Sequence, residues 1–504
     1  MKNSSNHYDL VIIGGGINGT AIALEASARG LKTLLCEKGD LASGTSSAST
    51  KLIHGGLRYL ASYEFSLVQA SLRDRNNLTK FAQHLVKPLD FYIPFKHKNS
   101  TYWKTKIGLW LYRHIAKPIA QPIAHPIAQP KHPFLNSESN DFLHFQDCYT
   151  DDARLVIANA KKAESLGAQI KTYTQLISAQ KIQNHWALIL QNQLSPTPPE
   201  TIHTSLVINA SGPWVEAIHT QLFQCKSNFK LQLIQGSHLL FPKLYEEDHA
   251  YLLPTSDNRV IFIIPYLNQF SMIGTTDLAL ETNIKNSTQF QLTQKEIDYL
   301  IQEVNPYLSQ KIKATQIIHH WSGARALPIK LGDADQKSTA NPSKISREVQ
   351  LEWCETDKNG PYLLSVWGGK LTTHRSLAIN AINMLSTKIK LTYASKIYSH
   401  YLNSTNNQPV DLSNLLSAYD FLPQSLKSRL VFSYGQDCLF FLKNCTQLSD
   451  LGKHFGQDLY EAEINYLIHH EWAKSLDDIL YRRTKMGFLL TQAEQMRLHA
   501  WLKP

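Results

Sequence analysis

The sequence predicts an α/β fold with a Rossmann-like first domain, an inserted mixed-sheet domain and an α-helical C-terminal domain. A buried-strand pattern, a glycine-rich turn and an alanine-rich helix follow one another in residues 10–29. Alternating strand patterns occupy much of residues 231–280, and helical patterns alone continue after about residue 385. At 504 residues, the chain is also too long for one compact core.

The first of these observations is a strand–turn–helix unit. Residues 10–13 form a short apolar strand, and residues 14–19 are Gly-Gly-Gly-Ile-Asn-Gly at the start of the helix. Gly14 makes the tight turn, Gly16 lets a pyrophosphate approach the backbone, and Gly19 lets helix and strand pack closely. The helix N-terminus adds N–H donors and a positive dipole end for the phosphates.

A second predicted strand, residues 32–36, is followed directly by Glu37. A carboxylate at this position can accept hydrogen bonds from a ribose diol, and it favours an unphosphorylated ribose. The acid therefore favours FAD or NAD over NADP. Together with the strand–turn–helix unit, it predicts a dinucleotide site.

The residues that follow distinguish between these cofactors. Residues 45–60 are Thr-Ser-Ser-Ala-Ser-Thr-Lys-Leu-Ile-His-Gly-Gly-Leu-Arg-Tyr-Leu, a run dense in small donors and glycines. A nicotinamide enzyme rarely needs such a run after its second strand, whereas a flavoprotein holds the isoalloxazine rim with backbone and hydroxyl donors. The segment therefore predicts FAD. The residues expected at the cofactor are Ser46, Ser47, Lys51, His54, Gly55 and Gly56.

Residues 43–59 resemble the FAD-dependent (aerobic, respiratory) glycerol-3-phosphate dehydrogenases, within the glycine/D-amino-acid-oxidase-like group of flavoproteins. Residues 460–467 and 477–484 resemble the C-terminal domain of that family. The resemblance implies oxidation of sn-glycerol 3-phosphate to dihydroxyacetone phosphate, with electrons passed through FAD to a membrane quinone. Three alternatives stay open: an oxidase that uses oxygen, an amine or amino-acid oxidase, and a non-catalytic flavin-binding redox sensor.

The same patterns divide the chain into domains. The mixed sheet is expected to cover the flavin and to interrupt the FAD-binding domain. The expected FAD-binding segments are about residues 1–80, 146–230 and 346–385, the substrate domain is about residues 81–145 and 231–345, and the C-terminal domain is residues 386–504.

Two later segments complete the predicted flavin site. A strand at residues 206–210 ends in small residues, and the family resemblance places this strand end against FAD. Residues 366–373, Val-Trp-Gly-Gly-Lys-Leu-Thr-Thr, precede a helix expected to start at Leu371 or Thr372, whose positive end stabilises charge near N1 and O2 of the reduced ring. The residues expected at the cofactor are Ala210, Gly212, Gly368, Gly369, Leu371 and Thr372.

His238 is the candidate general base. An imidazole titrates near pH 6.5, close to the optimum for proton transfer. His238 follows Gly236 and Ser237 and matches the Gly-Ser-His of the family. His54 competes for this role, but its position beside Gly55 favours contact with the flavin.

Arginine side chains are the candidate ligands of a substrate phosphate, because their forked guanidinium groups suit a dianion. Arg58 follows the glycine pair, while Arg325 and Arg347 match arginines that line the substrate pocket in related enzymes. Here the Arg-Pro-Leu of the family becomes Arg-Ala-Leu-Pro at residues 325–328, which leaves the path of that loop open. The predicted catalytic residues are His238 and Arg325. The predicted substrate-binding residues are Arg58, Tyr59, Arg325, Arg347 and Lys370, and no metal site is predicted.

The compartment is predicted from the cysteines and from missing targeting signals. The six cysteines contain no CxxC pair, which indicates a reducing compartment with neither a disulfide framework nor a zinc site. The N-terminal residues lack a signal-peptide core, and no run of about 18 apolar residues occurs. We therefore expect a peripheral protein at the cytoplasmic face of the membrane, without a transmembrane segment.

The net charge of +10 calls for an anionic partner. No basic arm, zinc finger or helix-turn-helix is found, so nucleic acid is not expected. An anionic membrane surface and a phosphorylated substrate account for the charge better.

Residues 103–117 interleave aromatic and cationic side chains, and residues 118–130 repeat Pro-Ile-Ala-Xaa. The first segment is either an interfacial anchor or a core helix before a low-complexity loop, and a homodimer stays open.

Overall fold

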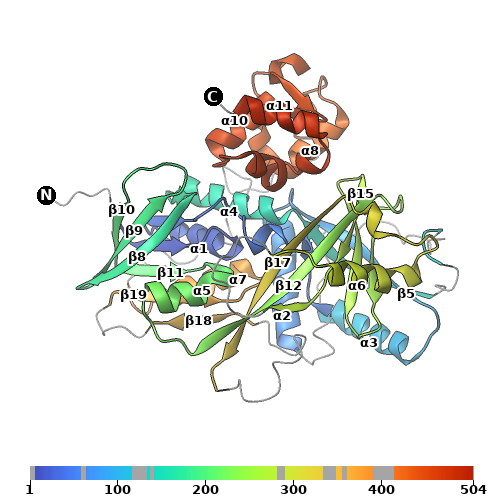
Figure 1. Cartoon of the computed structure of the whole chain (residues 1–504), viewed down its shortest axis with the longest axis horizontal. Coiled ribbons are helices and arrows are strands. Elements are labelled where there is room, and N and C mark those ends of the chain that lie inside the picture. Colours follow the sequence, from blue (N-terminus) through green and yellow to red (C-terminus); the bar gives the residue numbers. More distant parts are fainter. Residues whose placement is uncertain are drawn as a thin grey trace.

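Two large sheets and a helical C-terminal unit make up the computed structural model (Figure 1). It describes residues 6–57, 64–115, 133–136, 141–280, 290–332, 348–354, 360–389 and 414–502. The predicted residues Arg58, Tyr59 and Arg347 and the repeat at 118–130 lie outside these ranges.

A six-stranded sheet forms the centre of the predicted FAD-binding domain. Its strand order is β18-β19-β11-β2-β3-β7, parallel except for the edge strand β18. The strands are β2 (Leu10–Ile13), β3 (Thr33–Cys36), β7 (Gln169–Lys171), β11 (Leu206–Asn209), β18 (Gln350–Trp353) and β19 (Tyr362–Trp367). Every residue of β2, β3 and β11 is buried, as expected for a parallel sheet covered on both faces.

Helices cover one face of this sheet and a smaller sheet covers the other. The helices are α1 (Ile17–Ala28), α4 (Asp152–Ser165) and α7 (His374–Leu385), which share one apolar core with the six-stranded sheet. The smaller sheet has the order β1-β10-β9-β8, with β1 (His7–Tyr8), β8 (Thr174–Ile182), β9 (His185–Asn192) and β10 (Glu200–Thr204). Its apolar side chains pack against β2, β3 and β11.

The second large sheet is mixed and nine-stranded, and it lies beside the first (Figure 1). Its order is β16-β12-β15-β14-β13-β5-β6-β4, and β17 pairs with β12. The strands are β4 (Leu52–Ile53), β5 (Val86–Phe95), β6 (Asp141–Thr150), β12 (Phe229–Pro242), β13 (Ala250–Pro254), β14 (Val260–Tyr266), β15 (Phe270–Gly274), β16 (Leu278–Leu280) and β17 (His319–Lys330). Three helices pack on it: α2 (Phe65–Phe81), α3 (Ser100–Ile115) and α6 (Gln294–Val304). The predicted fold class is thus confirmed.

The C-terminal unit has its own apolar core. It contains α8 (Gln424–Tyr434), α9 (Leu439–Leu442), α10 (Glu461–His470), α11 (Gln492–Leu502) and a small pair of strands, β20 (His454–Gly456) and β21 (Leu459–Tyr460). The strand pair was not expected, because the sequence pattern after residue 385 is helical throughout.

Buried ion pairs join this unit to the first domain. The Arg154 guanidinium on α4 binds the Glu471 carboxylate through both of its terminal nitrogens, with Nη2 to Oε1 at 2.8 Å. The Arg483 guanidinium binds both oxygens of Asp40 at 2.6 and 2.7 Å. We call Arg154, Glu471, Arg483 and Asp40 the interdomain ion cluster. None of the four side chains is more than 4% exposed, so the two units share one buried polar interface.

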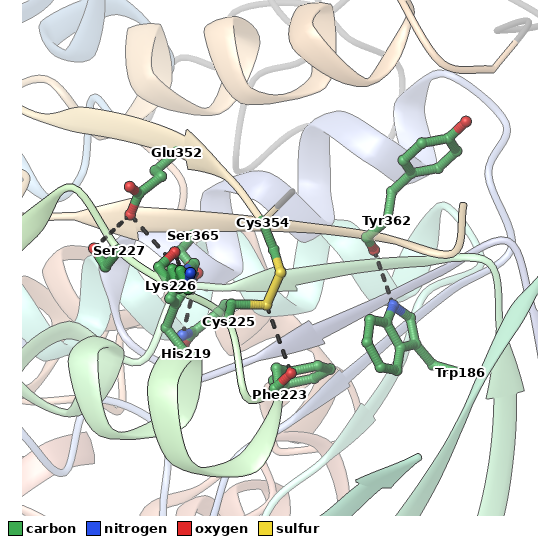
Figure 2. The surroundings of a disulfide bond; sticks show 11 residues. Trp186, His219, Phe223, Cys225, Lys226, Ser227, Glu352, Cys354, Tyr362 and Ser365 are labelled. Atoms are coloured by element: carbon green, nitrogen blue, oxygen red, sulfur yellow. Dashed lines mark hydrogen bonds and ion pairs between the residues drawn. A yellow bond between two sulfur atoms is a disulfide. The ribbon is translucent and has the colours of Figure 1, made fainter. Parts of the chain in front are cut away.

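The prediction that the cysteines form no disulfide is wrong. Cys225 and Cys354 are joined, with their Cα atoms 5.6 Å apart and a separation of 129 positions in sequence (Figure 2). Cys225 lies just before β12, and Cys354 directly follows β18. Sequence spacing gives no sign of this pair, because only the fold brings the two segments together.

The ends of two helices test the sequence predictions. α4 begins as expected, because the Asp151 carboxylate accepts a hydrogen bond from the Arg154 amide at 3.0 Å and caps the helix. It ends just before Gly167, which has the positive φ of +97° typical of this position. The predicted start of α7 at Leu371 or Thr372 is wrong, since residues 371–373 form a turn and the helix begins at His374.

Candidate active site

A cavity of about 2090 Å³ lies between the two large sheets. Its wall combines the glycine-rich turn before α1, the segment after β3, and residues of β12, β17 and the loop after β19. Ligand pockets usually measure about 300–1000 Å³. The cavity therefore has room for a dinucleotide and a substrate together.

The N-terminus of α1 and Glu37 form the dinucleotide end of the cavity. The first residue before α1 is Gly16, which carries no capping side chain, so the helix presents its positive end to the cavity. The Glu37 carboxylate accepts hydrogen bonds from the amides of Gly15 (2.7 Å) and Gly39 (2.9 Å). Each carboxylate oxygen has a further lone pair for a ribose hydroxyl. Burial raises the pKa of Glu37, and the two amide donors act against that shift.

Hydroxyl groups tie the segment after β3 to the surrounding elements. Ser46 Oγ accepts a hydrogen bond from the Ile17 amide at 3.0 Å, next to the start of α1. Thr45 Oγ1 donates to the Ala324 carbonyl of β17 at 2.7 Å. This segment therefore joins the start of α1 to the mixed sheet at the cavity wall.

His238 lies on β12, opposite Gly274 of β15. A Cβ atom at Gly274 would lie 2.3 Å from His238 Cδ2, so only glycine leaves room for the imidazole. The ring stacks on Trp321 with centroids 5.6 Å apart, and Nε2 lies 2.9 Å from Thr50 Oγ1. Burial and the cations of Lys51 and Arg325 lower the pKa of His238 to about 3. The imidazole is therefore neutral at physiological pH.

Arg325 enters the cavity from β17, where it pairs with Ile234 of β12. Its Nη1 binds the Asp277 carboxylate at 2.7 Å, and its Nη2 donates to the Thr276 carbonyl at 3.0 Å. A Cβ atom at Gly236 would lie 2.6 Å from Arg325 Nη2. The glycine of the Gly-Ser-His motif thus makes space for the arginine.

A buried carboxylate on α6 organises both of these side chains. Glu296 Oε1 accepts hydrogen bonds from Ser237 Oγ and Thr276 Oγ1, each at 2.7 Å. Its Oε2 accepts from Gln235 Nε2 at 2.9 Å and from Thr293. All these partners are donors, which an ionised carboxylate satisfies. Glu296 thereby fixes the residue next to His238 and the carbonyl that holds Arg325.

The loop after β19 closes the cavity beside α1. Gly368 and Gly369 have positive φ values of +84° and +112°, and the Gly368 carbonyl accepts a hydrogen bond from Asn18 Nδ2 at 3.1 Å. A Cβ atom at Gly369 would lie 2.4 Å from Asn18 Nδ2. Thr372 Oγ1 lies 3.3 Å from the His54 amide, which joins this loop to the predicted flavin segment.

Most of the predicted site residues that the structure describes line this cavity. They are Gly14, Gly16, Glu37, Ser46, His54, Gly56, Ala210, Gly212, His238, Arg325, Gly368, Gly369, Lys370, Leu371 and Thr372. Four others lie behind the wall: Gly19, Ser47, Lys51 and Gly55. Lys51 Nζ binds the Asp152 carboxylate at 2.8 Å.

Sequence reasoning missed Glu296, Asp277 and Arg259. Arg259 lines the cavity, binds the Asp257 carboxylate through Nε at 2.7 Å and lies over the Tyr299 ring. Only the polar Asp-Asn-Arg run at residues 257–259 hinted at it. Glu296 lies on an ordinary amphipathic helix, where a single acidic residue carries no sequence signal.

Comparison with known proteins shows which family the chain resembles. The family of FAD dependent oxidoreductases matches residues 9–375, and the C-terminal domain of alpha-glycerophosphate oxidase matches residues 394–500. The chain is 39% identical to the glycerol-3-phosphate dehydrogenase of Pseudomonas aeruginosa over 499 residues, which cover 98% of this chain and 95% of the relative. It is 36% identical to the D-erythritol 1-phosphate dehydrogenase of Brucella abortus over 502 residues, covering 98% and 97%.

A solved structure has the same fold. The glycerol-3-phosphate dehydrogenase of Bacillus halodurans, complexed with FAD, superposes with a TM-score of 0.74 at 24% identity, covering 99% of this chain and 94% of that one. The cofactor is FAD, and the residues present fit it, since the α1 N-terminus and Glu37 line a cavity of sufficient size. The chain belongs to the family of FAD-dependent glycerol-3-phosphate dehydrogenases.

Proposed function

We propose that this protein oxidises sn-glycerol 3-phosphate to dihydroxyacetone phosphate. The observation that carries the proposal is a neutral, buried His238 that shares one cavity with Arg325 and the dinucleotide end. FAD, when bound, supplies the hydride acceptor. The chain supplies the groups that bind the phosphate, orient the alcohol and take its proton.

His238 accepts the proton of the substrate hydroxyl in this proposal. In the neutral tautomer protonated on Nδ1, Nε2 keeps its lone pair and lies 2.9 Å from Thr50 Oγ1, which lines the cavity. Among the described residues, no group makes a hydrogen bond with Nδ1, although the atom is buried. We assign the proton transfer to Nε2, because its neighbour Thr50 lines the cavity whereas Nδ1 is shielded from it.

Arg325 binds the substrate phosphate in this proposal. Asp277 and the Thr276 carbonyl fix the guanidinium plane, so little side-chain entropy is lost when the dianion binds. Lys370 lines the same cavity and adds a second cation. Arg58, Tyr59 and Arg347 remain predicted substrate ligands on the strength of the family resemblance.

We also propose that the electrons pass to a membrane quinone, from a peripheral position on the cytoplasmic face. The cavity reaches α3, where Ile107 and Leu111 line it. The outer face of α3 exposes Trp103, Ile107 and Trp110 by 50%, 59% and 58%. Among the described residues, no helix is both long and apolar enough to cross a bilayer. An interfacial helix beside the cavity supports delivery of electrons to an apolar acceptor held in the membrane.

A longer polyol phosphate is the second candidate substrate. The Brucella abortus relative, named for D-erythritol 1-phosphate, is 36% identical to this chain. Both substrates present a phosphate and a secondary alcohol, so His238 and Arg325 suit either of them. Oxygen is the alternative acceptor.

Anaerobic stopped-flow measurement of flavin absorbance tests the proposal. We expect sn-glycerol 3-phosphate to bleach the purified holoenzyme faster than D-erythritol 1-phosphate, and a soluble quinone to reoxidise it faster than oxygen. Faster bleaching by the erythritol ester would reverse the substrate assignment.

Replacement of His238 by Gln should slow bleaching about 10²- to 10⁴-fold while substrate still binds. Unchanged bleaching in this variant would remove His238 as the base.

A further inference from the structure

The inner face of α3 carries a tyrosine whose hydroxyl contacts the predicted flavin segment. Tyr112 is 2% exposed. Its hydroxyl accepts a hydrogen bond from the Gly55 amide at 2.8 Å and donates to the Asp147 carboxylate, with both oxygens at 2.9 Å. Burial and the nearby Asp147 raise the pKa of Tyr112 well above its usual value, so the hydroxyl keeps its proton.

Asp147 is itself held by a buried ion pair. Arg75 of α2 binds it through Nη1 at 2.6 Å, and neither side chain is more than 4% exposed. A buried ion pair is stable only when its remaining hydrogen-bonding positions are filled. Tyr112 fills one of these positions and accepts the hydrogen bond of the Gly55 amide, which also lies 3.4 Å from Asp147 Oδ1. Asp147 lines the cavity, so this cluster forms part of its wall.

Gly55 fits tightly against both helices. A Cβ atom at Gly55 would lie 2.3 Å from Leu72 Cδ2 of α2 and 2.4 Å from the Tyr112 hydroxyl. Gly55 itself does not line the cavity, but its neighbours His54 and Gly56 do. The segment is therefore set against the helices on one side and faces the cavity on the other.

We propose that Tyr112 is a positioning residue that fixes residues 54–57 at the flavin, and that α3 thereby links the membrane-facing surface to the cofactor. The second part rests on the membrane location proposed above. Trp110 and Tyr112 are two residues apart, about 200° around the helix, so they lie on opposite faces of one rigid element. A displacement of the outer face of α3 therefore moves the hydroxyl that holds Gly55.

A single-atom change tests the first part. Tyr112→Phe keeps the ring and removes the hydroxyl, and Tyr102→Phe, buried on the same helix, is the matched control. We expect Tyr112→Phe to weaken FAD binding about 10-fold and to lower kcat, with the KM for sn-glycerol 3-phosphate changed less than about two-fold. Tyr102→Phe should match the wild type in all three quantities. Equal FAD affinity and kcat in the two variants would overturn the proposal.

Hydrogen exchange on the wild-type holoenzyme gives a second measurement that does not depend on how the variant folds. The Gly55 amide should exchange as slowly as the amides of β5, because its acceptor is buried. Rapid exchange at Gly55 would contradict the positioning role.

Vesicles of anionic phospholipid test the second part. Their addition should change the flavin fluorescence of the wild type and of Tyr102→Phe, but not that of Tyr112→Phe, while all three proteins bind the vesicles equally. An equal change in all three would disprove the link through Tyr112. If the wild type does not bind vesicles, the membrane location and the link through α3 both fail, and the comparison of FAD affinities still decides the positioning role.

Discussion

At the scale of single residues, the charge state of His238 is the property that most affects the proposed chemistry. The imidazole is buried and faces the cations of Lys51 and Arg325, so its pKa falls to about 3. A neutral imidazole is ready to accept a proton over the whole physiological range. Binding of a phosphate dianion beside Arg325 would partly cancel the cationic field and make the imidazole more basic when substrate is present.

The same shift predicts a pH dependence of stability. The unfolded chain protonates His238 near pH 6.5, whereas the folded chain does so only near pH 3. The unfolded state binds more protons between these values, so the contribution of His238 is complete above pH 6.5 and is lost as the pH falls toward 3. Between pH 7.5 and 5.5, the wild type should lose about 1 kcal/mol more than His238→Gln in urea unfolding. Identical losses would show that His238 does not titrate in this way.

Glu296 is the second residue on which the site depends. Glu296→Gln places an amide group among donors, so Ser237 and Thr276 lose their fixed positions. We expect kcat to fall and KM to rise together, with kcat/KM lower by about 10- to 100-fold, because both His238 and Arg325 shift. Asp298→Asn, an exposed carboxylate on the same helix, is the control. A change in thermal stability with normal kcat and KM would instead indicate a purely structural role.

Local sequence patterns predicted the dinucleotide end of the cavity, the family resemblance supplied His238 and Arg325, and neither of them predicted Glu296. The glycine-rich turn and Glu37 lie within one strand–helix–strand unit, so their spacing alone predicts their arrangement. Glu296 and Tyr112 reach the site from helices about 60 residues away from their partners in sequence. Their position depends on strand register and helix packing, which a local pattern does not contain.

At the scale of elements, α3 combines two faces of different character. Tyr102, Leu109 and Tyr112 are buried against the mixed sheet, while Trp103, Ile107 and Trp110 are exposed. The sequence left open whether this segment is a core helix or an interfacial anchor. The structure shows one buried and one exposed face, since helical residues three or four apart share a side, and the interfacial anchor stays a prediction.

The exposed face predicts membrane binding. Replacing Trp103 and Trp110 by Ser removes two aromatic side chains that we expect to insert at the bilayer surface. Binding to anionic vesicles in a sedimentation assay should weaken at least about 10-fold. Phe440→Ser, which removes an equally exposed aromatic ring from the C-terminal unit, should leave binding unchanged. Loss of binding in the control alone would place the membrane surface on the C-terminal unit instead.

At the scale of the whole molecule, the interdomain ion cluster decides whether the two units stay together. Glu471→Gln leaves Arg154 without its carboxylate partner in a buried site. Breaking a buried pair in this way costs about 3–5 kcal/mol. Calorimetry should show a lower and broader unfolding transition, while Asp420→Asn, a fully exposed carboxylate of the same unit, should behave as the wild type. An unchanged transition would mean that other contacts hold the interface.

The sequence predicted the sheets and helices of the molecule better than the contacts that hold distant segments together. The fold class follows from the βαβ unit, the strand-rich middle and the helical end, and it is confirmed. The limits of the discontinuous domains stay a prediction. The disulfide and the interdomain ion cluster were not predicted, because each joins segments more than 100 residues apart.

The strand order of the six-stranded sheet also bears on how the enzyme is made. β2 ends at residue 13, yet its neighbour β11 ends at residue 209 and β19 at residue 367. A ribosome adding about 5–20 residues per second needs roughly 20–70 s to pass from β2 to β19. For that time the nascent sheet is incomplete: one edge of β2 first lacks β11, and the free edge of β11 then lacks β19. Chaperones are suited to shield these apolar edges. FAD can bind only late in translation, when the strands that carry its site are complete. The supply of FAD and the rate of synthesis therefore together govern the yield of active enzyme.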